Sequence, residues 1–273
     1  MPEQDGRVAL VTGGSQGIGR GAALALAQHG SAVVVHGLDL AGAEQTVAEI
    51  TAGGGRAAAV AGPIDDPETT ESAVRAALHH FGALDILVTS AGIQRYGDVP
   101  STSLHTWNEV FAVNVTGVFL AAKAALPALR RSGAGAIVIV SSVQATATQT
   151  QVAAYTASKG ALLSLTRSLA VDEAAHGVRV NSVSPGSVDT PMLRASAALF
   201  GDGTGQGVED VLADWGTAHA LGRIARAEEI GEVVSFLAGP RASFVTGAEL
   251  RVDGGLLARL AAAVPPSNNG DTP

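Results

Sequence analysis

Short apolar runs rich in valine and isoleucine alternate along the chain with longer stretches of helical composition. The apolar runs predict seven strands, at residues 7–11, 32–35, 56–61, 85–88, 136–140, 178–183 and 249–252. The stretches between them predict helices, at residues 20–29, 41–52, 67–80, 103–131 and 153–176. Since runs that are apolar at every position suit strands buried on both faces, the pattern predicts a doubly wound α/β fold with a mostly parallel sheet and helices on both faces.

Local signals refine this pattern at two places. Asp66 followed by Pro67 predicts an N-cap and a first helical residue. The alternation breaks at residues 191–222, whose middle is rich in glycine, and a connection of that length predicts a lid inserted over a ligand site. We expect one domain over residues 1–260 and a disordered tail at 261–273.

Composition and charge exclude several classes of protein. Hydrophobic residues make up 47% and charged residues 15% of the 273 residues, which excludes intrinsic disorder. The net charge of −8, without a basic block, argues against nucleic acid or an anionic membrane as partner. Zero cysteines exclude a disulfide scaffold, a thiol nucleophile and Cys-ligated metal, and we expect no metal site. Neither a signal peptide nor an uninterrupted apolar run of about 18 residues is found, so we expect a cytoplasmic protein without a membrane span.

A glycine-rich turn follows the first strand directly. Gly13, Gly17 and Gly19 have the spacing Gly-x3-Gly-x-Gly and precede a predicted helix. A helix N-terminus offers free N–H groups and a positive dipole end to a phosphate, and glycines let the backbone approach it closely. A chain with 34 glycines produces such spacings by chance, but the strand–turn–helix–strand context favours dinucleotide binding.

Tyr155 and Lys159 lie four residues apart on a predicted helix, so they share one face. A nearby ammonium stabilises a phenolate and lowers the tyrosine pKa, which would make the phenol a usable base. Ser142 follows a strand thirteen residues upstream, where its hydroxyl could bind the reacting oxygen. A lone Tyr-x3-Lys is more often a solvated helix face, but this chain has only two tyrosines.

Together with Asn114 and Pro185-Gly186, these motifs occur in the order and spacing of the short-chain dehydrogenase/reductase family, which the chain resembles over residues 6–256. The resemblance implies a Rossmann fold and a catalytic set of Asn114, Ser142, Tyr155 and Lys159. In that family the tyrosine is the general acid/base and the serine holds the substrate oxygen. The lysine binds the nicotinamide ribose and lowers the tyrosine pKa, and the asparagine anchors a relay water. The implied cofactor contacts are Gly13, Ser15, Gln16, Gly17, Ile18, Gly19, Asp39, Ile64, Ala91, Gly92, Tyr155, Lys159, Pro185, Gly186, Val188 and Thr190.

The chain departs from the family pattern at two places. Thr89-Ser90 replaces a pair of asparagines that brace the sheet, which weakens a structural bracket more than the chemistry. Pro63 stands where the family commonly has an aspartate for the adenine amino group. Asp65 could substitute only in a shifted loop, so adenine binding would rest on packing against Ile64.

The choice between NAD and NADP is left open by the end of the second predicted strand. Gly37 provides no acid and Leu38 no arginine, while Gln16 adds no charge in the glycine turn. Asp39 could bind the ribose diol or cap the next helix. The absence of a cation favours NAD, but His36 could contact a phosphate, which keeps NADP open.

If the segment 191–222 forms a lid, several side chains converge on the reacting centre beside Ser142. They would form an aromatic wall with several polar groups, made of Gln94, Arg95, Tyr96, Gln144, Trp215 and His219. The surrounding segments locally resemble the aldose 1-dehydrogenase branch, although Trp215 could equally belong to the core and the glutamines to a solvated surface. We expect hydride transfer between a nicotinamide cofactor and a sugar-like secondary alcohol.

Two other functions are alternatives. An NADPH-dependent 3-oxoacyl carrier-protein reductase would need a basic docking patch, and the candidate arginines, Arg130, Arg131, Arg194 and Arg223, are scattered along the chain. A non-catalytic cofactor-binding sensor is disfavoured, because the tyrosine and the lysine are both present. The family resemblance further implies a homotetramer assembled through the helices near 103–131 and 153–176.

Overall fold

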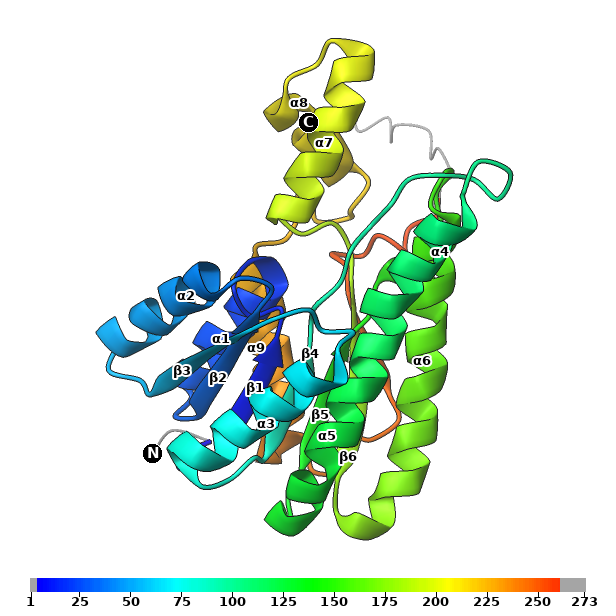
Figure 1. Ribbon diagram of the computed structural model, residues 1–273. Coiled ribbons are helices and arrows are strands. Elements are labelled where there is room, and N and C mark those ends of the chain that lie inside the picture. Colours follow the sequence, from blue (N-terminus) through cyan, green and yellow to red (C-terminus); the bar gives the residue numbers. More distant parts are fainter. Residues whose placement is uncertain (1–3, 261–273) are drawn as a thin grey trace, which may run out of the picture.

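The computed structural model describes residues 4–260 and confirms the predicted architecture (Figure 1). All seven strands form one parallel sheet in the order β3-β2-β1-β4-β5-β6-β7. The strands are β1 (Val8–Thr12), β2 (Ala32–Gly37), β3 (Ala57–Ala61), β4 (Ile86–Thr89), β5 (Ala136–Val140), β6 (Arg179–Pro185) and β7 (Glu249–Val252). The predicted tail at 261–273 lies outside the described residues.

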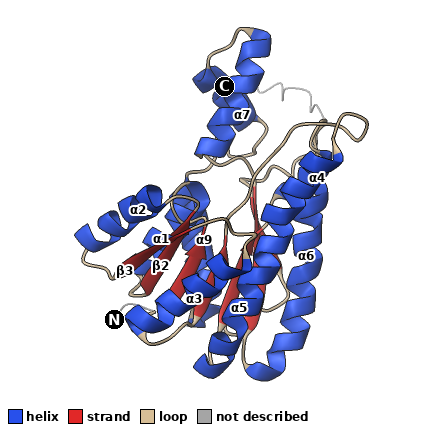
Figure 2. Cartoon of the chain, viewed as in Figure 1, coloured by secondary structure: helices blue, strands red, loops and turns tan. Residues whose placement is uncertain are grey.

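Helices cover both faces of the sheet, with the strands between them (Figure 2). The α-helices of the described chain are α1 (Gly17–Gln28), α2 (Leu40–Ala52), α3 (Pro67–Phe81), α4 (Leu104–Phe111), α5 (Gly117–Ser132), α6 (Ala153–Glu173), α7 (Pro191–Thr204), α8 (Val208–Thr217) and α9 (Ala227–Ala238). The predicted cap of α3 is confirmed, since the Asp66 carboxylate accepts the Glu68 N–H at 3.1 Å and Pro67 is the first helical residue.

Two helical predictions were wrong or incomplete. The helix expected over residues 103–131 is divided, because a π-helical segment, Ala112–Thr116, separates α4 from α5. The pattern also missed α9, which packs closely on α1. A Cβ at Gly231 would lie 2.4 Å from the Gly21 carbonyl oxygen, so only glycine permits this approach.

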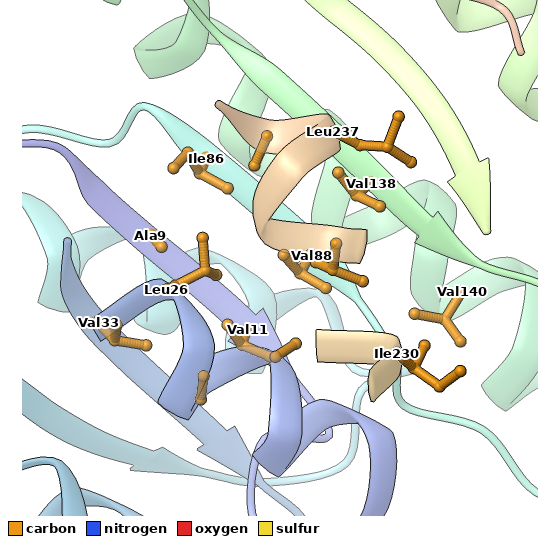
Figure 3. Packing of buried hydrophobic residues seen from close by; sticks show 14 of the residues in the cluster. Ala9, Val11, Leu26, Val33, Ile86, Val88, Val138, Val140, Ile230 and Leu237 are labelled. Atoms are coloured by element: carbon orange, nitrogen blue, oxygen red, sulfur yellow. The ribbon is translucent and has the colours of Figure 1, made fainter. Parts of the chain in front are cut away.

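Two hydrophobic clusters lie on opposite sides of the sheet. Successive β1 residues point to opposite faces, so Val11 packs with Leu26 and Ile230 beneath α1 and α9 (Figure 3), while Leu10 packs with Leu129 beneath α5. Burial on both faces is why the strands read as uninterrupted apolar runs.

The strand order switches at β1: β2 and β3 are added on one side of β1, and β4 to β7 are added on the other side. In open parallel sheets, ligands bind beyond the carboxyl ends of the strands at such a switch point. The segment predicted as a lid, 191–222, forms α7 and α8 at this end of the sheet (Figure 1). It has a small core of its own around Ala197, Val211 and Leu212.

The stretch Leu104–Ser132 is long and apolar enough, by length and composition alone, to cross a membrane. Only 39% of its most apolar window is buried in the fold. One side of α5, including Val118 and Ala125, belongs to the core beneath the sheet. The other side therefore leaves apolar surface without a cover from the described chain.

The close packing of the glycine turn predicts that Gly19→Ala is strongly destabilising. A Cβ at Gly19 would lie 2.1 Å from the rigid Gly13 carbonyl oxygen, and such overpacking costs about 1–3 kcal/mol. The matched control is Gly203→Ala in α7, where a Cβ meets open space and the free energy of unfolding should stay equal or rise. Urea denaturation measures both, and equal stability of the two variants would contradict the packing described.

Candidate active site

The glycine turn leaves a cradle that fits a pyrophosphate. Gly13 and Gly17 have positive φ angles of +65° and +53°. A Cβ at Gly13 would lie 2.7 Å from the Ala91 backbone. The first ladder hydrogen bond of α1 joins the Arg20 N–H to the Gln16 carbonyl at 3.1 Å, so the preceding N–H groups of the first turn have no helix partner. The first turn holds no acidic residue, which suits an anion.

The turn after β4 forms the opposite wall of this cradle. The Thr12 hydroxyl accepts the N–H groups of Ser90 and Ala91, at 3.3 and 3.5 Å. The Thr89 hydroxyl is buried without a partner. The brace expected from carboxamides at 89–90 is therefore supplied from β1. A Cβ at Gly92 would lie 3.3 Å from the Asn114 side-chain oxygen, so this glycine keeps the floor of the site open.

Asn114 is fully buried inside the π-helical segment. Its side chain accepts the Ile93 N–H at 2.8 Å and donates to the Ile93 carbonyl and the Ser158 hydroxyl, both at 3.0 Å. The side chain thus ties the β4 turn to α6. Its predicted part in anchoring a relay water stays a prediction, because these three hydrogen bonds all go to protein atoms.

Ser142, Tyr155 and Lys159 converge at the carboxyl end of β5. Helix α6 begins at Ala153, which places Tyr155 and Lys159 one turn apart on the same face. The Lys159 ammonium donates to the Val140 carbonyl at 3.0 Å and lies 5.5 Å from the centre of the Tyr155 ring. The Tyr155 hydroxyl shares a hydrogen bond with the Ser142 hydroxyl. The Ser142 oxygen also accepts the Gln144 N–H at 3.1 Å.

Burial dominates the electrostatics of this group. It raises the pKa of Tyr155 to about 12, against a smaller lowering by the Ser142 hydrogen bond and a further rise from Tyr96. Burial also lowers the pKa of Lys159 to about 8. The expected lowering of the tyrosine pKa by the lysine is therefore not found within the protein alone. The ammonium is aimed at a carbonyl, and the low polarity that destabilises it destabilises the phenolate as well.

The other wall of the cleft comes from the segment after β6. The Thr190 hydroxyl caps α7 by accepting the Leu193 N–H at 3.2 Å. A Cβ at Gly17 would lie 3.1 Å from the Thr190 methyl group, so the start of α7 touches the glycine turn. Val188 forms a parallel bridge with Ala225. The implied cofactor residues Ile18, Pro185, Gly186, Val188 and Thr190 all line the adjoining cavity.

That cavity has a volume of about 380 Å³ and lies between the serine–tyrosine pair and the lid. Its lining contains the expected residues Gln94, Tyr96, Ser142, Gln144, Tyr155, Trp215 and His219. The Gln144 side-chain oxygen is buried without a hydrogen-bond partner. None of the described lining residues is Asp, Glu, Lys or Arg.

Apolar residues that the sequence did not single out complete the cavity, namely Val143, Met192, Leu193, Leu256 and Leu257. Phe200, which is not among the lining residues, connects the lid to the body of the protein through aromatic contacts. The centre of its ring lies 5.8 Å from that of Tyr96 and 5.5 Å from that of Trp215, both in edge-to-face geometry. Three aromatic rings therefore connect the loop after β4 to α7 and α8.

Three sequence expectations are corrected by these contacts. Arg95 is not among the lining residues of the cavity and forms an ion pair with Glu109 at 2.6 Å. His219 lines the cavity, but its ring nitrogens are bonded to the backbone of Trp215 and Ser187, so they are not available to a substrate. His36 is buried, with its ring nitrogens bonded to backbone groups, and is not free to contact a phosphate.

At the adenine end, the capping alternative for Asp39 is observed. Its carboxylate accepts the Gly42 N–H at 2.8 Å and caps α2. Ile64 is 7% exposed and packs against Gly117, where a Cβ would lie 2.8 Å from the Ile64 methyl group. Only a small part of Ile64 is therefore open to an adenine ring. Asp65 is exposed.

The buried lysine predicts how stability changes with pH. Its pKa is about 8 when folded and 10.5 in the reference state, so the unfolded chain binds more protons between these values. The free energy of unfolding should therefore rise by about 2 kcal/mol from pH 7 to pH 10 through this group. Above about pH 10 the raised pKa of Tyr155 reverses the sign, because the unfolded phenol then loses its proton first.

Denaturation of Lys159→Met at several pH values checks this, because that variant should lack the rise. The control is Lys123→Met, since Lys123 is the other lysine of the chain and is exposed on α5. A rise of the same size in Lys159→Met and in the unaltered protein would contradict the burial of the ammonium.

Comparisons with known proteins agree with this geometry. A family model described as "Enoyl-(Acyl carrier protein) reductase" matches residues 13–257. The cis-4-hydroxycyclohexanecarboxylate dehydrogenase of Sinomonas cyclohexanicum is 40% identical over 258 residues, covering 92% of this chain and 97% of that protein. The cyclohexanol dehydrogenase of Acinetobacter sp. (strain SE19) is 38% identical over 251 residues, covering 91% and 94%.

Among solved structures, the ligand-free aldohexose dehydrogenase of Thermoplasma acidophilum superposes with a TM-score of 0.86 at 33% identity, covering 97% of this chain and 99% of that one. The family match spans the glycine turn, the serine, the tyrosine and the lysine, on a parallel seven-stranded sheet. This chain belongs to the short-chain dehydrogenase/reductase family.

Proposed function

We propose that this protein transfers hydride between a nicotinamide cofactor and an uncharged ring alcohol that carries further hydroxyl groups. The observation that carries the proposal is the cavity beside the serine–tyrosine pair. None of its described lining residues is an acid, a lysine or an arginine, several are apolar, and one of them, Gln144, has a buried carboxamide oxygen without a partner, which a rotation of the side chain would turn to a substrate. A buried acceptor without a partner is costly, and a substrate hydroxyl would relieve that cost.

The cofactor would be held by the glycine turn, by Lys159 and by the Pro185–Thr190 segment. When bound, the nicotinamide ring would supply the hydride acceptor or donor. Ser142 would hold the substrate oxygen through its hydroxyl, which already bonds Tyr155. Tyr155 would give its proton to a carbonyl oxygen in reduction and accept the hydroxyl proton in oxidation. Since burial favours the protonated phenol and the uncharged amine, a nearby positive charge is needed before the phenolate becomes a good base.

The substrate class draws on the names of the relatives as well as on the cavity. Two of them are dehydrogenases of six-membered ring alcohols, and the structural neighbour is an aldohexose dehydrogenase. A pyranose and a hydroxylated cyclohexanol share a neutral six-membered ring with several hydroxyls. Within residues 4–260 no lysine or arginine lines the cavity to bind a substrate carboxylate, so we favour the neutral members of this class, sugars included.

The reductase of 3-oxoacyl carrier proteins fits less well. Arg130, Arg194 and Arg223 are each paired with an acid of the protein itself, which reduces their use as a docking patch for an acidic partner. A non-catalytic sensor is also disfavoured, because the serine–tyrosine hydrogen bond and the buried lysine are both in place.

A panel of alcohols tests the substrate class. We expect faster turnover of a pyranose or a cyclohexanediol than of 4-hydroxycyclohexanecarboxylate. Gln144→Leu should lower kcat/KM for the polyhydroxylated ring about tenfold, the effect of one hydrogen bond, while changing cyclohexanol little. The control is Gln45→Leu on the exposed face of α2. Faster turnover of the carboxylate, or an unaltered preference in Gln144→Leu, would contradict the proposal.

We infer a preference for NAD from the end of β2. The ionisable side chain that follows the strand is the acid Asp39, and Ser15 packs beside Gly37, 3.0 Å from where a Cβ would lie. The nearby cation of α1, Arg20, is paired with Glu49. A carboxylate at this place repels the 2′-phosphate of NADP.

Asp39→Asn tests this preference, because asparagine keeps the helix cap but removes the charge. The ratio of kcat/KM for NAD to that for NADP should exceed about ten and should fall in Asp39→Asn, since about 1.4 kcal/mol corresponds to a factor of ten. Asp66→Asn, at the cap of α3, serves as the control. A preference for NADP in the unaltered protein would overturn the inference.

We propose a homo-oligomer joined through the outer face of α5 and α6. An apolar groove there is lined by Phe119, Ala122, Lys123, Leu126, Pro127, Arg130, Leu165 and Leu169. Phe119 is 50% exposed, and Arg130 is neutralised by the buried Glu173 carboxylate at 2.7 Å. A second copy would present the same apolar face and cover it.

Phe119→Glu should lower the mass measured by sedimentation, because it buries a charge in that contact. Val99→Glu, on an exposed loop, should leave the mass unchanged. Sedimentation of the unaltered protein as a monomer of 27.2 kDa would contradict the oligomer.

A further inference from the structure

Two buried histidines lie at the two ends of the cleft, outside the reacting group. His36 is the last but one residue of β2, which is buried throughout, and is 2% exposed. Its Nδ1 accepts the Gly13 N–H at 3.4 Å, and its Nε2 meets the Gly62 carbonyl at 3.0 Å. The ring thus joins the glycine turn to the loop after β3, the two segments expected beside the pyrophosphate and the adenine.

His219 makes the same type of bridge at the other end. It is 2% exposed and follows α8. Its Nε2 accepts the Ser187 N–H at 3.1 Å, and its Nδ1 meets the Trp215 carbonyl at 3.1 Å. A Cβ at Gly186 would lie 2.7 Å from Nε2, so the ring is packed directly against the segment expected beside the nicotinamide.

We propose that His36 and His219 are positioning residues for the cofactor, one for each half, and that they act as neutral rings in opposite tautomers. His36 must carry its proton on Nε2, because Nδ1 accepts an N–H. His219 must carry it on Nδ1, because Nε2 accepts an N–H. The effect on the cofactor rests on the proposed function, whereas the tautomers follow from the protein alone.

The residue type explains why histidine occupies both places. Each buried ring lies between one backbone donor and one backbone acceptor, one at each ring nitrogen. A neutral imidazole has one acceptor and one donor nitrogen, and an aliphatic side chain would leave the Gly13 and Ser187 N–H groups without the acceptor that each has here, whereas the Trp215 carbonyl also accepts the Ala218 N–H at 3.4 Å. Burial lowers the pKa of His36, which agrees with a neutral ring. A glutamine has the same two functions and is the conservative replacement.

The tautomers are measured first, by ¹⁵N NMR of the ring nitrogens in the protein without ligand. We expect the Nε2–H form for His36 and the Nδ1–H form for His219, with slow hydrogen exchange at the Gly13 and Ser187 amides. A protonated ring, a ring averaging between tautomers, or the reverse assignment at either site would overturn the proposal. This measurement needs no activity, so it stands even if the proposed function fails.

Binding and kinetics then separate the two halves. ADP-ribose, which carries adenine and pyrophosphate but no nicotinamide, serves as the probe in calorimetry. His36→Leu should weaken ADP-ribose binding tenfold or more and raise the KM for the dinucleotide with little change in kcat. His36→Gln should bind ADP-ribose more tightly than His36→Leu does, although less tightly than the unaltered protein. His219→Leu should leave ADP-ribose binding unchanged, lower kcat, and speed exchange at the Ser187 amide, with partial rescue by His219→Gln.

The matched control is His79→Leu, since His79 is exposed on α3. Unaltered ADP-ribose binding in His36→Leu, or equal weakening of that binding by His36→Leu and His219→Leu, would overturn the assignment of one histidine to each half. If the unaltered protein neither binds ADP-ribose nor oxidises any alcohol, the proposed function fails, and the NMR result alone decides on the histidines.

Discussion

The burial of one ammonium beside one phenol is the constraint on which the site depends. Lys159 is 5% exposed, and no carboxylate of the described chain forms an ion pair with it. Its fixed partner is the Val140 carbonyl. Low polarity therefore lowers the pKa of the amine to about 8 and raises that of Tyr155 to about 12. Burial thus favours the uncharged form of each group, although an amine with a pKa of about 8 is still largely protonated at pH 7. The chemistry therefore needs a further positive charge that stabilises the phenolate.

The parallel sheet supplies the rigid frame for this arrangement. Because all seven strands run in one direction, the ends of β1, β4, β5 and β6 deliver their loops to one edge. The loops are locked to each other by backbone contacts and by short side-chain brackets. Gly13 lies against Ala91, and Asn114 ties the β4 turn to Ser158 of α6. The same packing explains why glycine is needed at positions where any larger residue would separate two loops.

The sequence was sufficient for the parts governed by local pattern. Uninterrupted apolar runs located all seven strands to within two residues at every end, and the four-residue spacing of Tyr155 and Lys159 put them on one helical face. What depends on distant packing could not be read from it. Helix α9 escaped prediction, and the π-helical break around Asn114 has no local signature.

The role of a side chain was hardest to predict from the sequence where it depends on burial or on partners far along the chain. The direction of the Tyr155 pKa shift follows from desolvation, which only the folded structure reveals. His219 was expected at the substrate and is instead bonded to the backbone of Ser187, 32 residues away in sequence. Nothing in one sequence indicates which nitrogen of a histidine is already occupied.

The role of Tyr155 is tested by mixing the protein, NAD and a ring alcohol and measuring how fast the absorbance of reduced nicotinamide appears, for the unaltered protein and for Tyr155→Phe. We expect turnover by the unaltered protein and a loss of about 10²–10⁴-fold in the variant, the usual contribution of a general acid–base group. Cofactor affinity should change little, because phenylalanine keeps the ring. Near-normal turnover by Tyr155→Phe would contradict the account.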